Sequence, residues 1–242
     1  MSGTGLPRRA ERDIDRLVHH FVTNRALFET LLDSVKACVV RSEALGPVIH
    51  SIKSRVKDPE HLREKLRRKA FKAIEDGKKF DITVENLFQK INDLAGFRIL
   101  HLYTRQMETI NAALLAIFDE AKFVLLEGPI ARTWDDESRA YFKEIKVGTE
   151  DSPTLYTSVH YVIKANTKSE CTCEIQVRTL MEEVWGEVDH SLNYPQQSKS
   201  FACREQIKVL ARVTSSCSRL VDSIFLTHEG ERKAVGSSGR KT

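Results

Sequence analysis

The chain has 242 residues, of which 41% are hydrophobic and 30% are charged, and its formal net charge is +4. A chain of this length can bury a core without support from metals or disulfides, which excludes a small disulfide-rich scaffold. Its five cysteines form no CxxC pair and no apolar run reaches membrane-spanning length, so we expect a soluble, cytoplasmic protein that does not contact a membrane.

The beginning of the chain is expected to be helical. Apolar residues at helical spacing form one stripe within residues 14–21 and a second within residues 28–35, and the pattern breaks near Asn24. We therefore assign residues 1–50 to an N-terminal helical segment.

A strongly basic segment follows, over residues 53–79. It begins with the alternation of a short strand, which puts Arg55 and Lys57 on one side, and Asp58 with Pro59 then marks the start of a helix. This helix carries a cationic row at the spacings i, i+4, i+7 and i+11: His61, Lys65, Arg68 and Lys72.

The cationic row is either a solvated helix face or a site for phosphates. Solvated faces are the commoner origin of such rows, but acidic partners four residues away are nearly absent here. Like charges at this spacing repel unless an anion joins them, and several converging Lys and Arg side chains suit a triphosphate. We therefore favour a polyphosphate site.

The middle of the chain alternates between strands and helices. Asp93 precedes an apolar strand, a helix is predicted over residues 106–120, and a strand over residues 123–130. An acidic loop or helix then leads to GTEDSPT, a segment rich in turn residues. The next strand, over residues 155–165, has one polar side, which includes Tyr156, Ser158 and His160.

The strand over residues 171–179 is the expected hairpin partner of this strand, and its two sides differ. One side is expected in the core and consists of Cys171, Cys173, Ile175, Val177 and Thr179. The other side carries a carboxylate, an amide and a guanidinium in a row: Glu174, Gln176 and Arg178. Such a row is costly to bury but suits a charged ligand.

Two further helices are predicted. The first has a stripe that we expect to face inward, Met181, Val184, Trp185, Val188 and Leu192, and a polar stripe beside it, Glu183, Glu187, His190 and Tyr194. The second is expected to pack through Ile207, Leu210, Val213, Cys217, Leu220 and Ile224. We divide the remaining chain into a catalytic domain (51–195), a C-terminal helix (196–228) and a disordered basic tail (229–242).

Together, the polar side chains indicate a nucleotide site. Asp93 and Glu174 come from different strands, and two converging carboxylates repel each other unless a cation lies between them. A hard divalent ion that bridges phosphate oxygens is the usual solution, so we expect Mg²⁺. Tyr156 offers an exposed ring on which a base can stack, although a tyrosine in a strand is more often half-buried packing.

The motifs resemble those of the RelA/SpoT homologues, and in particular of their short branch, the small alarmone synthetases. The matching segments, in the expected order, are RVKDPEHLREKL, NDLAGFRIL, YTSVHYVI, CEIQVRT and WGEVDHSLNY. The resemblance implies an α/β fold, with a nucleotidyltransferase-like mixed sheet flanked by helices. It also implies an ATP-dependent pyrophosphokinase that moves the β,γ-pyrophosphate of ATP to the 3′-hydroxyl of an acceptor, usually GDP or GTP, and releases AMP.

The resemblance also assigns roles to individual residues. Asp93 and Glu174 are the implied catalytic and Mg²⁺-binding carboxylates. The implied ATP ligands are Arg55, Lys57, Lys65, Arg68 and Arg98. The residues implied to bind the acceptor are Tyr156, Ser158, His160, Gln176, Arg178, His190 and Tyr194.

The acceptor stays open at this stage. GTEDSPT is acidic where the family carries a basic segment for the 5′-phosphates of the acceptor. A toxin-like enzyme that modifies adenine nucleotides or a tRNA 3′ end, with a neutralising protein partner, therefore remains an alternative, as does assembly into a homo-oligomer. A third alternative is an inactive module that senses nucleotides, against which the presence of both Asp93 and Glu174 argues.

Overall fold

A mixed six-stranded sheet forms the centre of the computed structural model, which describes residues 6–193 and 198–238. The strand order is β1-β2-β6-β5-β3-β4, in which β2 pairs with β6 and β3 with β4 in parallel, while the other neighbours are antiparallel. The strands are β1 (Ser51–Val56), β2 (Ala95–His101), β3 (Phe123–Thr133), β4 (Gly148–Asp151), β5 (Ser158–Ala165) and β6 (Thr172–Thr179).

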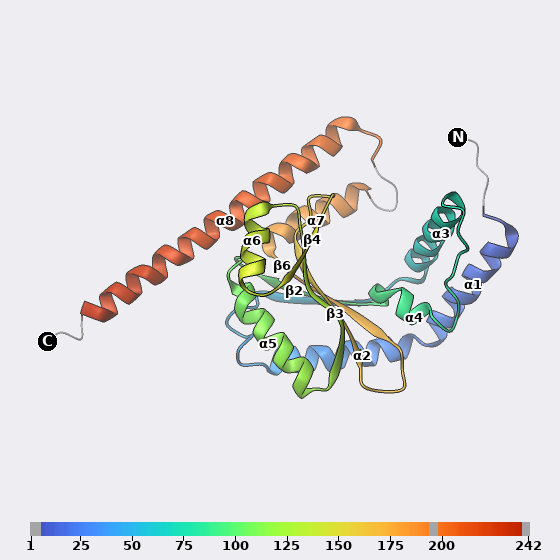
Figure 1. Ribbon diagram of the computed structural model, residues 1–242, viewed down its shortest axis with the longest axis horizontal. Helices are drawn as coiled ribbons and strands as arrows, with labels where there is room; N and C mark the ends of the chain where they lie inside the picture. Colours follow the sequence, from blue (N-terminus) through green and yellow to red (C-terminus); the bar gives the residue numbers. More distant parts are fainter. Residues whose placement is uncertain (1–5, 194–197, 239–242) are drawn as a thin grey trace.

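Helices lie on both sides of the sheet (Figure 1). They are α1 (Arg8–Thr23), α2 (Arg25–Arg41), α3 (Pro59–Glu75), α4 (Leu87–Lys90), the short 3-10 helix η1 (Asn92–Leu94), α5 (Gln106–Glu120), α6 (Asp136–Glu144), α7 (Leu180–Asn193) and α8 (Phe201–Ser238). In Figure 1, α2 and α5 lie below the sheet, whereas α7 and α8 lie above it. The expected mixed sheet flanked by helices is thus confirmed.

The main core lies between the sheet and α2 and α5. The apolar side of β6 faces it as predicted, because Cys173, Ile175 and Val177 are buried. The predicted start of α3 is also observed, since the Asp58 carboxylate accepts hydrogen bonds from the backbone N–H groups of Glu60 and His61. The sequence therefore predicts this half of the molecule correctly.

The region around β4 and β5 differs from the prediction. β5 begins at Ser158 and not at residue 155, because Leu155 adopts a positive φ of 59°, which breaks the strand conformation. The segment GTEDSPT contains β4, and its Glu150 pairs with Arg132 of β3. Both sides of β5 are buried up to Ile163, so its polar side is not open to solvent.

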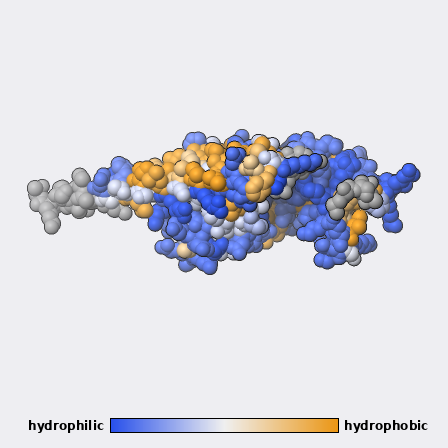
Figure 2. All heavy atoms as spheres, turned by 90° about the horizontal axis from the view of Figure 1, so that it is seen from above, coloured by the Kyte–Doolittle hydropathy of each residue, from blue (hydrophilic) through white to orange (hydrophobic). Residues whose placement is uncertain are grey.

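The inward stripes predicted for the last two helices are largely wrong. In α7, Val184 is 52% exposed, whereas Glu182 and Glu183 are each only 6% exposed. In α8 the predicted stripe faces inward only at its start, where Ile207 is buried and Leu210 packs beside it, whereas Val213, Leu220 and Ile224 are exposed. Farther along, the side chains that face the body are small or polar, with Thr214, Ser215 and Ser218 among them. Figure 2 shows hydrophobic side chains gathered along the outer side of α8.

The tail also differs from the expectation. We expected disorder from residue 229, but α8 continues to Ser238, and residues 239–242 lie outside the described chain. In Figure 1 this part of α8 projects away from the sheet.

Candidate functional site

An open cleft lies on the side of the sheet that faces α7, over the neighbouring strands β1, β2 and β6. The strand register sets Arg55 beside Gly96 and Gly96 beside Glu174. The cleft consists of two adjoining hollows, of about 310 and 360 Å³, which share Arg55, Arg98, Gln176 and Glu187. We call the first the carboxylate hollow, because Asp93 and Glu174 line it, and the second the Tyr156 hollow.

Asp93 is held by two of the predicted phosphate ligands. It lies in η1, directly before β2, and its two carboxylate oxygens are each 2.8 Å from the Nζ atom of a lysine, Lys57 for one and Lys65 for the other. Burial alone would raise the pKa of Asp93, but the charges of Lys65 and Lys57 hold it below its ordinary value. The carboxylate is therefore ionised, and phosphate oxygens would compete with it for both lysines.

Glu174 faces the same hollow from β6. Its carboxylate lies 3.2 Å from Nδ1 of His160 and accepts a hydrogen bond of 3.0 Å from the Gln176 amide. Burial acts to raise the pKa of Glu174, yet the His160 contact outweighs it and the pKa is lowered. Glu174 is thus an ionised carboxylate within a hollow that is large enough for phosphates.

The two carboxylates fit a magnesium site in their chemistry. Mg²⁺ is usually bound by one or two carboxylates, and phosphate and water oxygens complete its shell, so Asp93 and Glu174 supply a sufficient donor set. Within residues 6–193 and 198–238, no cluster of three or more His, Cys, Asp or Glu side chains could hold a metal ion by itself. A metal here would accordingly depend on the substrate for further ligands.

Glu183 joins three cations and was not among the predicted site residues. Its carboxylate lies 2.7 Å from Nζ of Lys53, 2.9 Å from a guanidinium nitrogen of Arg98, and 2.8 Å from Nε of Arg178. Burial acts to raise its pKa, but the hydrogen bond from Lys53 and the two guanidinium charges lower it. The sequence placed Glu183 on the polar stripe of its helix but gave no sign of its partners, because two of them, Lys53 and Arg98, come from strands that are distant in the chain.

Tyr156 is half-buried, since other side chains pack against its ring, and the residue lines the Tyr156 hollow. The Arg178 guanidinium lies 5.5 Å from the ring centroid, and the Trp185 ring lies 5.9 Å away. Arg178 also passes so close to Gly186 of α7 that a Cβ atom there would lie 2.6 Å from its Nη1 atom. The expectation of an exposed ring is therefore wrong, and the second interpretation, half-buried packing, describes Tyr156.

The other predicted site residues are divided between the cleft and its surroundings. Gln176, Arg178 and His190 line the Tyr156 hollow, and Arg98 lines both hollows. Arg68 is exposed on α3 and lines neither hollow, and Tyr194 lies outside the described residues. Lining residues that the sequence prediction did not include are Lys53, Ser54, Gly96, Phe97, Thr154, Trp185, Gly186, Glu187, Asp189 and Asn193.

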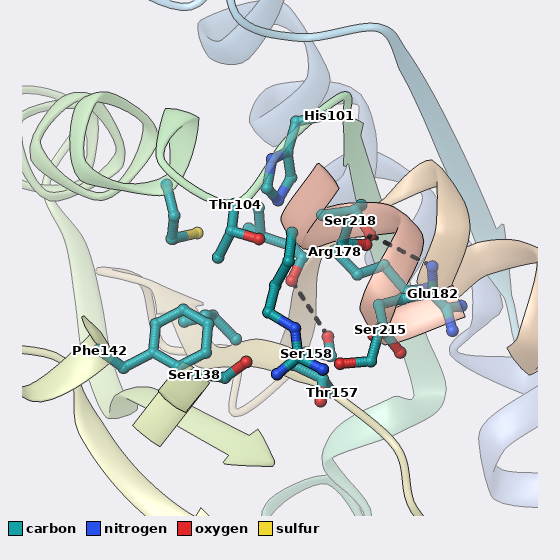
Figure 3. A pocket seen from close by; sticks show the side chains of 15 residues that line it. His101, Thr104, Ser138, Phe142, Thr157, Ser158, Arg178, Glu182, Ser215 and Ser218 are labelled. Atoms are coloured by element: carbon teal, nitrogen blue, oxygen red, sulfur yellow. Dashed lines mark hydrogen bonds between the residues drawn. The ribbon is translucent and has the colours of Figure 1, made fainter. Parts of the chain in front are cut away.

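Ser158 belongs to a different hollow, the α8 cavity, which lies between the sheet and α8 and has a volume of about 30 Å³ (Figure 3). Its hydroxyl donates a hydrogen bond to the backbone carbonyl of Val177, and Glu182 and Ser215 lie nearby on the cavity wall. Burial raises the pKa of Glu182 to about 8. This volume suits one water molecule and excludes a nucleotide.

Most residues of the cleft lie in a region that matches a known protein family. A family model described as "Region found in RelA / SpoT proteins" matches residues 54–199, which is more than half of the chain. The chain belongs to the RelA/SpoT family. The matched region contains Arg55, Asp93, Glu174 and Glu183, and therefore most of the cleft. Among curated proteins, no sequence matches this RelA/SpoT chain.

Solved structures share the fold of this RelA/SpoT chain. The small alarmone synthetase 1 from Bacillus subtilis is similar with a TM-score of 0.62 and 20% identity, over 89% of this chain and 99% of that one. The same protein bound to its product pppGpp gives a TM-score of 0.56 and 19% identity over 86% and 96% of the two chains. Bound to AMPCPP, it gives a TM-score of 0.54 and 17% identity over 87% of this chain and 97% of that one.

No described helix is long and apolar enough to span a membrane.

Proposed function

We propose that the chain is a cytoplasmic ATP-dependent pyrophosphokinase that transfers the β,γ-pyrophosphate of ATP to the 3′-hydroxyl of GDP or GTP. The observation that carries this proposal is the carboxylate hollow, in which the ionised Asp93 and Glu174 face the cations Lys53, Arg55 and Arg98. The similar Bacillus subtilis enzyme was solved with pppGpp and with AMPCPP, an ATP analogue, which supports both proposed substrates.

ATP would bind through charge. We assign its phosphates to Arg55, Lys57, Lys65 and Arg98, with Arg68 at the approach on α3, because triphosphates favour converging cations. Lys57 and Lys65 would turn from Asp93 to phosphate oxygens and so leave that carboxylate for a metal ion. A bound Mg²⁺ would neutralise charge on the transferring phosphates.

Glu174 would act on the acceptor. Its ionised carboxylate can accept the proton of the 3′-hydroxyl as that oxygen attacks the β-phosphorus of ATP and the bond to the α-phosphate breaks, which releases AMP. His160 and Gln176 hold the carboxylate in place from neighbouring strand positions. The chain's part is thus to position the reactants and to stabilise charge.

The acceptor would enter the Tyr156 hollow, where Tyr156, Gln176, Arg178 and His190 are available to its base and phosphates. The toxin-like alternative, with an adenine nucleotide or a tRNA 3′ end as acceptor and a neutralising protein partner, is favoured by one observation. The segment GTEDSPT contains no Lys or Arg, and its Glu150 pairs with Arg132 of β3, so the segment supplies no positive charge for acceptor phosphates.

One experiment separates these proposals. The purified protein is incubated with Mg²⁺, ATP labelled in its β-phosphate and, in separate reactions, GDP, GTP, ADP, AMP or tRNA, and the labelled products are resolved. Transfer to GDP or GTP with release of AMP supports the main proposal, and transfer to ADP, AMP or tRNA supports the alternative. Label that stays in ATP in every reaction, with Asp93→Asn as the matched blank, would favour the inactive sensing module.

A further inference from the structure

The two hollows of the cleft share one buried counter-ion. Of these two hollows, Lys53 lines the carboxylate hollow, Arg178 lines the Tyr156 hollow, and Arg98 lines both. Arg178 also reaches the wall of the α8 cavity. All three cations contact the carboxylate of Glu183, which is 6% exposed and lies in the first turn of α7. Glu183 therefore lies where a charge that enters one hollow can act on the other.

The charges around Glu183 do not balance. One buried carboxylate contacts three cations, and the nearest second carboxylate, that of Glu187, is 3.0 Å from Arg98 and 3.9 Å from Lys53 on a side chain that is 55% exposed. Arg178 forms its salt bridge with Glu183 and not with Glu187. Anions that bind in the cleft would complete the neutralisation, and each would change how Glu183 divides its contacts.

Arg178 is the cation whose position matters to the second hollow. Its guanidinium lies over the Tyr156 ring, and the backbone of α7 at Gly186 limits its movement on the other side. The contact with Glu183 fixes its third side, at Nε. Arg178 therefore shapes the Tyr156 hollow, and the position of Arg178 depends on its contact with Glu183.

From this arrangement we propose that Glu183 is a positioning residue that couples the two hollows, so that a triphosphate bound in the carboxylate hollow strengthens acceptor binding in the Tyr156 hollow. The triphosphate draws Lys53 and Arg98 away from Glu183, and the carboxylate then holds Arg178 alone and more firmly over Tyr156. The substrate assignments rest on the proposed function. By linkage, the acceptor strengthens triphosphate binding by the same factor.

The test measures binding and not turnover. AMPCPP and GDP are titrated by calorimetry in the presence of Mg²⁺, each alone and each with the other at saturation. For the unmodified chain we expect GDP to bind at least about fivefold more tightly when AMPCPP is present, which is the lower end of typical coupling between sites. For Glu183→Gln we expect this factor to fall to about one, while AMPCPP alone binds as tightly as before or more tightly because Lys53 and Arg98 lose a competitor.

A matched control is the neighbouring residue in α7. Glu182 is also 6% exposed and lines the α8 cavity, but Lys53, Arg98 and Arg178 form their salt bridges with Glu183 and not with Glu182, so Glu182→Gln should retain the coupling factor of the unmodified chain. Gly186→Ala tests the second contact of Arg178, and we expect it to weaken GDP binding while AMPCPP binding alone stays the same. If Glu183→Gln does not fold, Glu183→Asp keeps the charge but lengthens the contacts and should reduce the factor.

The outcomes separate the two proposals. Binding of both ligands to the unmodified chain without coupling, or equal coupling in Glu183→Gln, overturns the role of Glu183 and leaves the proposed function standing. Binding of neither ligand overturns both. A coupling factor that falls equally in Glu182→Gln would show general damage to α7, which also overturns the specific role of Glu183.

Discussion

Two consecutive glutamates of α7 are both buried but differ in protonation state. Glu183 contacts three cations that line the cleft, and they keep it ionised, whereas Glu182 lines the α8 cavity, where burial raises its pKa to about 8 and it holds its proton at neutral pH. Both are equally buried. Burial acts to raise the pKa of both glutamates, and at Glu183 the contacts with three cations outweigh it, so Glu183 carries the charge.

The largest expected effect lies in the cleft. Glu174→Gln keeps the size of the side chain but removes the charge that would accept a proton, so we expect turnover to fall by at least about a hundredfold, the scale of a lost general base. The measurement is the rate of pyrophosphate transfer, together with AMPCPP binding, which should persist. A variant that turns over at the normal rate would remove Glu174 from the mechanism.

The next effect concerns ATP. Arg55 is exposed at the rim shared by both hollows, and Arg55→Ala should remove a charge-assisted contact of about 1.5 to 3 kcal/mol, which raises the Michaelis constant for ATP. Arg67→Ala is the matched control, because Arg67 lies on α3 and pairs with Glu11 away from the cleft. Equal constants for both variants would contradict the assignment of the carboxylate hollow to phosphates.

A smaller effect concerns acceptor binding, and it compares Tyr156 in the cleft with Ser158 in the α8 cavity. Tyr156→Ala removes the ring under Arg178, and loss of a stacking surface worth about 1 to 3 kcal/mol should raise the Michaelis constant for the acceptor more than that for ATP. Ser158→Ala alters the α8 cavity and should leave both constants unchanged. If Ser158→Ala raised the acceptor constant as much as Tyr156→Ala did, the division between cleft and cavity would be wrong.

The smallest effect is on stability and belongs to the cavity. The pKa of Glu182 rises on folding from an ordinary 4.5 to about 8, so between these pH values the folded chain keeps a proton that the unfolded chain has lost. The free energy of unfolding therefore falls as pH rises through this window. We expect the melting temperature to drop between pH 6.5 and 8, and Glu182→Gln to reduce that drop.

The pH range for this measurement avoids a second buried group. Burial lowers the pKa of His101 to about 4, so its effect appears only below its ordinary value of 6.5, where the unfolded chain takes up a proton first and stability falls with falling pH. Identical pH profiles for Glu182→Gln and the unmodified chain above pH 6.5 would show that Glu182 is ionised in the folded state.

The sequence predicts the cleft better than it predicts the helices around it. Alternation along β6 separates Ile175 in the core from Glu174 in the cleft, because the pleat of a strand alone decides this. Helical spacing likewise finds the apolar stripe of α8, but it cannot say which way the stripe faces. That direction depends on partners such as Asp135, which accepts hydrogen bonds from Ser215 and Arg219. These two residues lie 80 and 84 positions after Asp135 in the chain.

The site follows the same rule. Glu174 and Arg55 lie in strands that the pattern identifies, Asp93 directly precedes another, and the structure brings all three to one cleft. Glu183 was missed as a site residue because its role depends on a contact with Lys53, which lies 130 residues earlier in the chain. A local sequence pattern cannot show such a contact. Tyr156 was misjudged because Leu155 has a positive φ and β5 begins only at Ser158, so Tyr156 lies outside the strand whose alternation was used to place its ring.

α8 is attached to the body largely through polar contacts, and this determines where the molecule unfolds locally. Buried apolar side chains of α8 are concentrated near its beginning, where Ile207 and Ala211 pack with Trp185. Farther along, α8 is held by hydrogen bonds such as that between Ser218 and Thr179 and by the stacking of Phe225 on Tyr103. Hydrogen bonds of this kind each stabilise by about 1 kcal/mol, far less than a packed apolar side. In hydrogen–deuterium exchange, the amides of α8 beyond residue 225 should accordingly exchange well before those of α5, and the loss of protection should advance from residue 238 toward Ile207.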